Sequence, residues 1–102
     1  MNQEAKQPLI LDIQLEKLDE QRIHCIVELS KFNQNPDLVI ELSQQNGEPL
    51  ASITIIETPD HHNSYVLHTK KPMPIEQIIV QASLLYSEQG IVHQITKSFS
   101  EK

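Results

Sequence analysis

The chain has 102 residues, with 14 acidic and 8 basic side chains, so its formal net charge is -6 at pH 7. This length fits one domain, and the acidic balance argues against nucleic acid or an anionic membrane as the main partner, because both bind positive surfaces. No stretch approaches the roughly 20 apolar residues that span a bilayer, and the start of the chain lacks the pattern of a signal peptide. Together with the single cysteine, these features predict a small soluble protein of the cytoplasm.

Residues 1–7 are polar and are predicted to form a disordered tail. After them, apolar and polar residues alternate as they do in half-buried strands. The first predicted strand has its odd-numbered positions facing inward: Leu9, Leu11, Ile13 and Leu15. A polar turn at residues 19–21 leads to a second strand over residues 23–30. The short gap between the two strands indicates an antiparallel hairpin.

The middle of the chain repeats this pattern. A third strand over residues 38–43 leads to Asn46-Gly47, a pair that favours the positive φ angles of a type I′ hairpin turn. The returning strand is predicted from Pro49 to Glu57. A polar loop over residues 58–64 and a short strand over residues 65–69 follow.

The stretch over residues 75–87 is ambiguous between a helix, which its length allows, and a strand. Three β-branched residues in a row favour the strand, and apolar residues on both faces are typical of a strand central to a sheet. The preceding residues 70–74 contain two prolines, which exclude a central strand there. Residues 87–90 fit a turn whose glycine supplies a left-handed residue, and residues 91–99 form the last predicted strand.

Seven short strands with turn residues between them predict an all-β protein, a single antiparallel β-sandwich over residues 8–99 with a C-terminal tail over residues 100–102. A small barrel is the alternative. The pattern resembles an immunoglobulin-like or fibronectin type III-like sandwich in architecture. The chain has one cysteine and no tryptophan, so the cysteine pair and core tryptophan of antibody domains are missing, and Tyr86 lies too late in its strand for a tyrosine corner. The resemblance implies a fold and no function.

Apolar residues beyond strict alternation indicate an interaction surface. Isoleucines at 53, 55 and 56 interrupt the alternation, as do the pairs at 78–79 and 84–85. Such residues lie in central strands or under a loop, or they form an outer-face patch that marks a partner or dimer interface. The short strand beginning at Tyr65 is expected at a sheet edge, where a peptide or a second copy can add a strand. We therefore predict a non-enzymatic interaction module that needs no cofactor, binds a protein partner or itself, and uses Ile53, Ile55, Tyr65, Ile79 and Leu85.

The alternative function is binding of a metal ion or small ligand by four histidines: His61, His62, His68 and His93. His61 and His62 are adjacent and point to opposite faces of an extended chain, while His68 and His93 could meet across a sheet. The sequence has no metal-site spacing. A hydrolase is a third possibility, although the chain lacks nucleophile-elbow and phosphate-binding motifs. Cys25 is expected in the core with an inert thiol, on the opposite strand face from His24.

Overall fold

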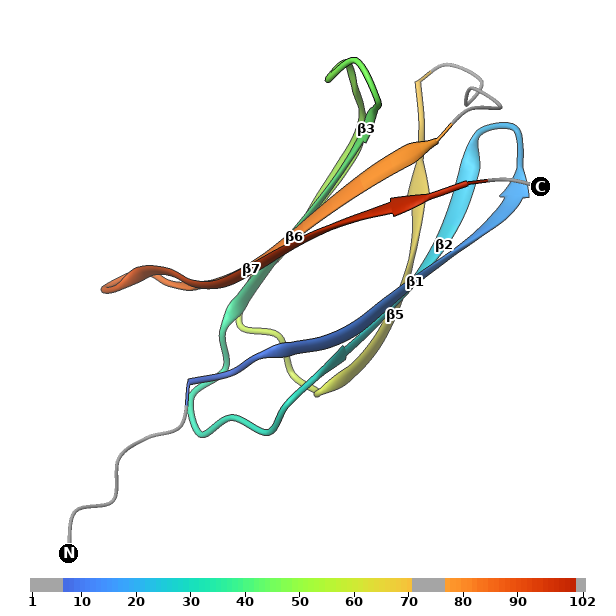
Figure 1. Ribbon diagram of the computed structural model, residues 1–102. Coiled ribbons are helices and arrows are strands. Elements are labelled where there is room, and N and C mark those ends of the chain that lie inside the picture. Colours follow the sequence, from blue (N-terminus) through green and yellow to red (C-terminus); the bar gives the residue numbers. More distant parts are fainter. Residues whose placement is uncertain (1–6, 71–76, 101–102) are drawn as a thin grey trace, which may run out of the picture.

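The computed structural model describes residues 7–70 and 77–100, which form seven strands in two facing sheets and contain no helix (Figure 1). The all-β sandwich is therefore confirmed. No helix that could cross a bilayer is present within these residues. The predicted tails and the 70–74 loop lie largely outside the described residues. The strands are β1 (Ile10–Asp19), β2 (Arg22–Leu29), β3 (Asp37–Gln44), β4 (Pro49–Ile55), β5 (His62–His68), β6 (Ile78–Tyr86) and β7 (Gly90–Phe99).

The three-stranded sheet has the order β1-β2-β5 and the four-stranded sheet the order β4-β3-β6-β7, with every neighbouring pair antiparallel. Immunoglobulin-like sandwiches likewise place strands 1, 2 and 5 in one sheet and strands 3, 6 and 7 in the other. In this chain β4 lies beside β3 instead of extending the first sheet. β6 lies between β3 and β7, the central position predicted for it, and its inward residues Val80, Ala82 and Leu84 are buried in the core. The strand prediction for this stretch is thus confirmed over the helix.

The core lies between the sheets and is built mainly by the three central strands. Alternate positions of β2, β3 and β6 are at most 1% exposed. These residues are Ile23, Cys25, Val27, Leu29, Leu38, Ile40, Leu42, Val80, Ala82 and Leu84. Most inward residues of the edge strands β4 and β7 are only partly buried. The inner side chains of the sandwich are therefore most exposed along the two sides where edge strands of the two sheets meet.

The first strand differs from its predicted facing. Ile10 is 6% exposed, whereas Leu9 and Leu11 are 45% and 58% exposed. A register shift between Ile10 and Asp12 leaves one extra residue opposite β2, so the inward position moves from even to odd numbers and only Ile13 onward faces as predicted. The prediction that Leu9 and Leu11 face inward is wrong because a bulge is a property of strand pairing, and regular alternation cannot reveal it.

β5 begins at His62, inside the segment predicted as a loop over residues 58–64. It pairs with β2 from Glu28 onward and continues to His68 without a register shift. The strand is longer than predicted because backbone groups of β2 need partners along its whole length, whatever side chains lie opposite. The predicted edge position of β5 is confirmed, and so is Pro49 as the first residue of β4.

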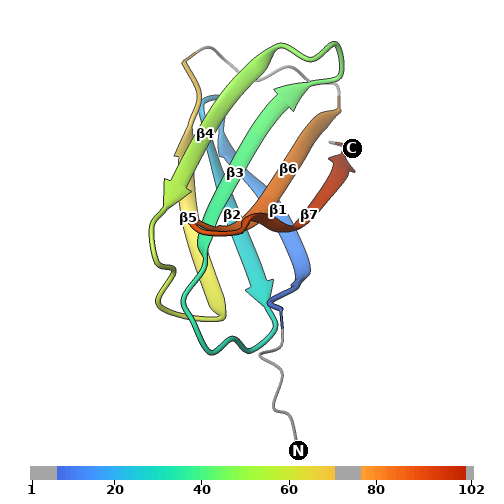
Figure 2. The ribbon, with the colours of Figure 1, turned by 90° about the vertical axis from the view of Figure 1, so that its left-hand side faces the viewer.

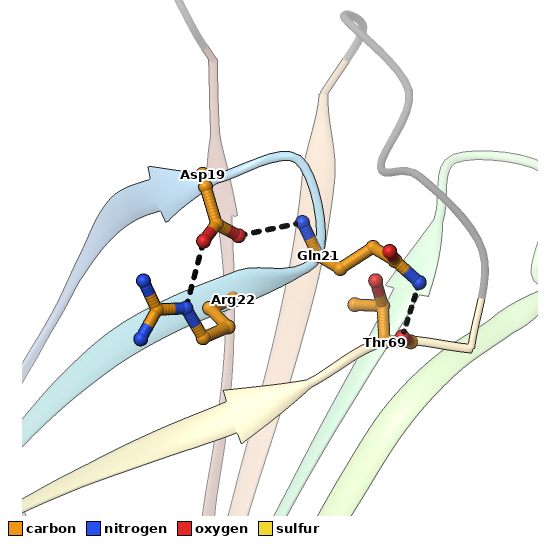
Figure 3. Close-up of polar contacts among 4 residues, drawn as sticks. All are labelled: Asp19, Gln21, Arg22 and Thr69. Carbon is orange, nitrogen blue, oxygen red and sulfur yellow. Dashed lines mark hydrogen bonds and ion pairs between the residues drawn. The ribbon is translucent and has the colours of Figure 1, made fainter.

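The turn between β1 and β2 is held by side chains and tied to the end of β5 (Figure 3). Asp19 accepts hydrogen bonds from the Gln21 backbone N–H at 2.9 Å and from Arg22 Nε at 2.7 Å. The Gln21 side-chain amide donates to the Thr69 carbonyl at 3.3 Å. The bond from the Gln21 N–H, followed by the one from Arg22, holds the pKa of Asp19 below its usual value. These hydrogen bonds thereby hold the turn between β1 and β2 next to the end of β5.

Candidate interaction site

Edge strands of the two sheets meet along two sides of the sandwich, the β1/β7 side and the β4/β5 side (Figure 2). Along the β1/β7 side, side chains of β7 bond the backbone of β1. His93 Nδ1 accepts a hydrogen bond from the Ile10 N–H at 2.9 Å, and Lys97 Nζ donates to the Ile13 carbonyl at 3.3 Å. Lys97 Nζ also lies 3.5 Å from an Asp12 carboxylate oxygen. Polar contacts therefore close this side.

The β4/β5 side is apolar, and three of the predicted interaction residues lie there. Ile53 and Ile55 belong to β4 and Tyr65 to β5. Their cross-strand partners are core residues, so all three point between the sheets and pack against the core while staying partly exposed. The idea of an outer-face patch at Ile53 and Ile55 is therefore wrong, because residues directly opposite one another in a ladder share one face.

Ile79 and Leu85 lie on the outer face of the four-stranded sheet, near opposite ends of β6. Ile79 is flanked by serines of both neighbouring strands. Between the two residues the face is polar, with Glu41, Gln81 and Thr96 in one cross-strand row. The structure thus divides the five predicted residues among three places rather than gathering them into one site.

Three apolar residues, Ile56, Leu85 and Ile91, lie in one cross-strand row of this outer face at the end near the β6–β7 turn, with Asp37 between Ile56 and Leu85, and we call the three the apolar row. Leu85 lies opposite Ile91 on β7 and opposite Asp37 on β3. Ile56 follows the last residue of β4, beside Asp37 at the end of the β3–β4 ladder. Ile56 is 66% exposed and Ile91 58%. Neither is among the predicted site residues: adjacent isoleucines signal Ile56, but no local pattern singles out Ile91.

A shallow hollow of about 460 Å³ borders the apolar row. Its lining residues are Gln34, Asn35, Asp37, Ile56, Glu57, Tyr86 and Ser87. The two carboxylates make the hollow acidic, and its amides and hydroxyls can donate and accept hydrogen bonds. The Tyr86 hydroxyl donates to the Gln34 carbonyl at 2.7 Å, and burial raises the pKa of Tyr86, so this hydroxyl is protonated at neutral pH. The hollow therefore offers polar groups beside an apolar surface.

The turn after β4 is strained where it meets the hollow. Glu57 has a φ of 52°, in the left-handed region that residues other than glycine rarely adopt. The Asp37 carboxylate holds this turn by accepting a hydrogen bond from the Glu57 N–H at 2.8 Å. The next residue, Thr58, is fully buried, and its Oγ1 has no hydrogen-bond partner within residues 7–70 and 77–100. Strain and an unpaired buried hydroxyl both reduce stability, and such features concentrate at functional sites.

The four histidines predicted as alternative ligands are dispersed. His62 and His68 lie on the outer face of β5, and His61 Nδ1 lies 3.4 Å from the Asp60 carboxylate. His93 belongs to the other sheet and binds the β1 backbone, so the predicted meeting of His68 with His93 does not occur. Across the part of the chain that the structure describes, no three His, Cys, Asp or Glu side chains are placed to hold a metal ion. The geometry gives the metal hypothesis no support.

Cys25 is fully buried, as predicted, and burial raises its pKa to about 12. Such a thiol is protonated at neutral pH and is a poor nucleophile. His24 faces the other side of β2, also as predicted, where its Nε2 lies 3.1 Å from Ser64 Oγ. Its Nδ1 lies 3.7 Å from a Glu16 carboxylate oxygen, too far for a hydrogen bond. The side chains of His24, Ser64 and Glu16 therefore lie spread across an exposed sheet face, and they do not converge in the hollow described above.

No protein-family model matches the chain, and no curated protein matches it in sequence. Solved structures of glycosidases match it in fold. A β-glucuronidase from Lactobacillus rhamnosus aligns over 92% of this chain with a TM-score of 0.62 and 12% identity. A glycosyl hydrolase family 2 member from Bacteroides cellulosilyticus aligns over 91% with a TM-score of 0.65 and 9% identity. A β-glucuronidase of glycoside hydrolase family 2 aligns over 91% with a TM-score of 0.59 and 11% identity.

This chain spans only 16%, 15% and 12% of the lengths of those three enzymes. The likeness therefore concerns a small part of each enzyme, and identities this low show a shared fold alone. The comparison is consistent with the β-sandwich fold of this chain. It assigns no activity to the hollow or to the apolar row, because one fold serves many unrelated functions.

Proposed function

We propose that this chain is a non-enzymatic protein-interaction module of the cytoplasm, and that the apolar row formed by Ile56, Leu85 and Ile91 is its binding surface. The observation that carries the proposal is the exposure of two branched apolar side chains at one end of a largely polar sheet face, Ile56 at 66% and Ile91 at 58%. Covering such a side chain completely contributes roughly 1.5–3 kcal/mol. A partner that covers both gains a useful part of its binding free energy there.

The surroundings of the apolar row fit a protein interface. Stable interfaces have an apolar centre and a polar rim that forms hydrogen bonds. Here the adjoining hollow supplies the rim, with the Asp37 and Glu57 carboxylates and the amide of Gln34 among its lining groups. The acidic rim favours a partner segment that carries a basic residue next to apolar ones. The absence of a cofactor and of catalysis is part of this proposal.

The glycosidase activity of the structural neighbours is not carried over to this chain. Their likeness covers at most 16% of each of the three enzymes named above and rests on fold alone. Cys25 is fully buried and burial raises its pKa to about 12, so its thiol is a poor nucleophile. These observations support a binding role over a catalytic one.

Photo-crosslinking tests the proposal directly. A photoreactive phenylalanine analogue is placed at position 91 and, in a matched control, at position 11, because Ile91 and Leu11 are both 58% exposed. Leu11 lies on β1 in the other sheet. In extract of the native cell we expect a discrete crosslinked protein from position 91 and none from position 11. The same crosslinking pattern at both positions would contradict the proposal.

Affinity measurements then test the contribution of the row to the binding of the identified protein. Substitution of Ile91 by serine removes a side chain that is more than half exposed, so we expect affinity to fall about tenfold. Leu11→Ser serves as the control and should leave affinity unchanged. Circular dichroism of both variants confirms that the fold is retained. An Ile91→Ser variant that binds as tightly as the parent chain would overturn the assignment of this surface.

A further inference from the structure

β5 is an unprotected sheet edge. Edge strands usually carry a proline, a bulge or a lysine that prevents pairing with another chain. β1 and β7 carry register shifts and are joined through the bonds of His93 and Lys97, and β4 begins at Pro49 and has a shift of its own. β5 has neither proline nor lysine and pairs with β2 without a shift. Among the four edges of the described sandwich, it is the one that lacks such a device.

Two hydrogen bonds establish which backbone groups of β5 face its open edge. The Leu29 N–H donates to the His61 carbonyl at 2.7 Å, and the Thr69 N–H donates to the Gln21 carbonyl at 2.8 Å. Hydrogen-bonded residue pairs alternate along an antiparallel ladder, so the odd-numbered residues of β5 bond β2. The N–H and C=O groups that face the open edge therefore belong to His62, Ser64, Val66 and His68.

We propose that β5 pairs antiparallel with β5 of a second copy of this chain, about a two-fold axis at Tyr65, so that the two three-stranded sheets become continuous. Tyr65 is the middle residue of the strand, so this register uses its full length. Ser64 then lies opposite Val66 of the second copy, and His62 lies opposite His68. All four residues have edge-facing backbone groups, as hydrogen-bonded pairs require.

Charge supports a second copy as the occupant. β5 contains no Asp, Glu, Lys or Arg, so no permanent like charges meet across the pair. On the outer face, the cross-strand row that ends at His62 contains Asp12 and Glu28, whereas the row that ends at His68 contains Arg22 and Asp19, which neutralise each other at 2.7 Å. The two-fold axis continues the acidic row of one copy into the neutral row of the other, so two acidic rows do not meet. The same arrangement arises twice, as a symmetric dimer requires.

The pairing also covers the least buried apolar side of the sandwich. Ile53, Ile55 and Tyr65 pack against the core at the β4/β5 side but remain partly exposed. Opposite residues of a ladder share one face, so Tyr65 of the second copy lies next to Tyr65 on this inner side. An aromatic pair at that position favours the pairing beyond the surface that it covers. The second copy therefore covers apolar surface that β4 and β5 leave open.

Analytical ultracentrifugation of the full chain provides the first test. We expect a reversible monomer–dimer equilibrium whose dissociation constant rises about tenfold in Val66→Lys, because a lysine at the edge opposes strand pairing. Leu18→Lys is the matched control, since Val66 and Leu18 are both 43% exposed, and it should dimerise like the parent chain.

Disulfide trapping then tests the register. A mixture of the single variants Ser64→Cys and Val66→Cys should form a crosslinked heterodimer under mild oxidation, because directly opposite Cα atoms lie about 5.5 Å apart. Each variant alone, and a mixture of His62→Cys with Val66→Cys, should not crosslink, because their sites are offset by two residues and lie about 7–8 Å apart. The native Cys25 is fully buried and does not compete.

A chain that stays monomeric at every attainable concentration would overturn this inference. So would a dimer that Val66→Lys leaves intact, or one that crosslinks equally well in the offset mixtures. The inference uses the edge of β5 and is independent of the apolar row at Ile56, Leu85 and Ile91. Crosslinking from position 91 would therefore survive the failure of the dimer, and a β5 dimer would survive the failure of the apolar row.

Discussion

Alkaline pH should destabilise this protein through Cys25, and Cys25→Ala should remove that part of the pH dependence. The thiol is fully buried, and burial raises its pKa from 9.0 to about 12. The unfolded chain releases the thiol proton above pH 9.0, while the folded chain keeps it. The contribution of the Cys25 thiol to the free energy of unfolding is therefore fully present below pH 9.0. This contribution is lost as the pH rises toward the folded pKa.

The size of the effect follows from the difference between the two pKa values. Each pH unit above the unfolded pKa costs about 1.4 kcal/mol as long as the folded thiol stays protonated. Between pH 8 and pH 10 we therefore expect Cys25 to account for a loss of about 1.4 kcal/mol. Burial also raises the pKa of Tyr86, which titrates in both proteins and cancels in the comparison. The pKa of Tyr65 is raised by burial and, second, by the charge of Cys25, so the part that Cys25 causes belongs to the measured difference.

Urea unfolding of the parent chain and Cys25→Ala at pH 8 and pH 10 measures this loss. Alanine leaves a small cavity, which lowers the stability of the variant by a constant amount at both pH values. The measured quantity is the difference between the two losses of unfolding free energy. Equal losses in the two proteins would refute the reasoning, because the folded and unfolded thiols would then titrate alike. The thiol should likewise resist a thiol reagent until the chain unfolds.

Three further substitutions test the core and the strained turn by thermal or urea unfolding. Ile13→Ala removes a side chain that is 0% exposed and should lower the unfolding free energy by about 2–5 kcal/mol. Glu57→Gly relieves the strain of a φ of 52° and should raise the stability by about 1 kcal/mol, although glycine also increases the entropy of the unfolded chain. Thr58→Val removes the buried hydroxyl that has no partner among the described residues and should be neutral or stabilising.

Each of these predictions has an opposing outcome and a control. A loss below about 1 kcal/mol for Ile13→Ala would show that this position is not part of a packed core. A clear loss of stability in Glu57→Gly would mean that the Glu57 side chain stabilises the turn more than its backbone strain costs. Destabilisation by Thr58→Val would show that Oγ1 forms a hydrogen bond in solution. Leu18→Ala, at a residue that is 43% exposed, controls for the general effect of shortening a side chain.

The candidate site illustrates how little of a surface is fixed by local pattern. Adjacent isoleucines mark Ile56 in the sequence, but Ile91 sits in a strand whose alternation is unremarkable. The two residues belong to distant segments, and the apolar row exists only because β3 and β6 bring the end of β4 and the start of β7 to the same end of the sheet. Similarly, Ile53 and Ile55 face the core because their partners on β3 do.

The sequence by itself determined the strands and most of the turns. Alternation with period two and β-branched residues predict the strands, and Gly47 and Gly90 mark turns in which they adopt φ angles of 94° and 78°. The type I′ turn predicted at Asn46-Gly47 is wrong in its type, because Asn46 does not share the positive φ of Gly47. Both signals act over a few residues, so they can be recognised without knowing what lies opposite.

Only the tertiary structure decided the facing of Leu9 and Leu11, the early start of β5 at His62 and the difference between the closed β1/β7 side and the open edge of β5. Each of these depends on pairing between segments far apart in the chain. A bulge, an edge or a shared outer face is a relation between strands, and the side-chain pattern of one strand carries no record of its neighbour.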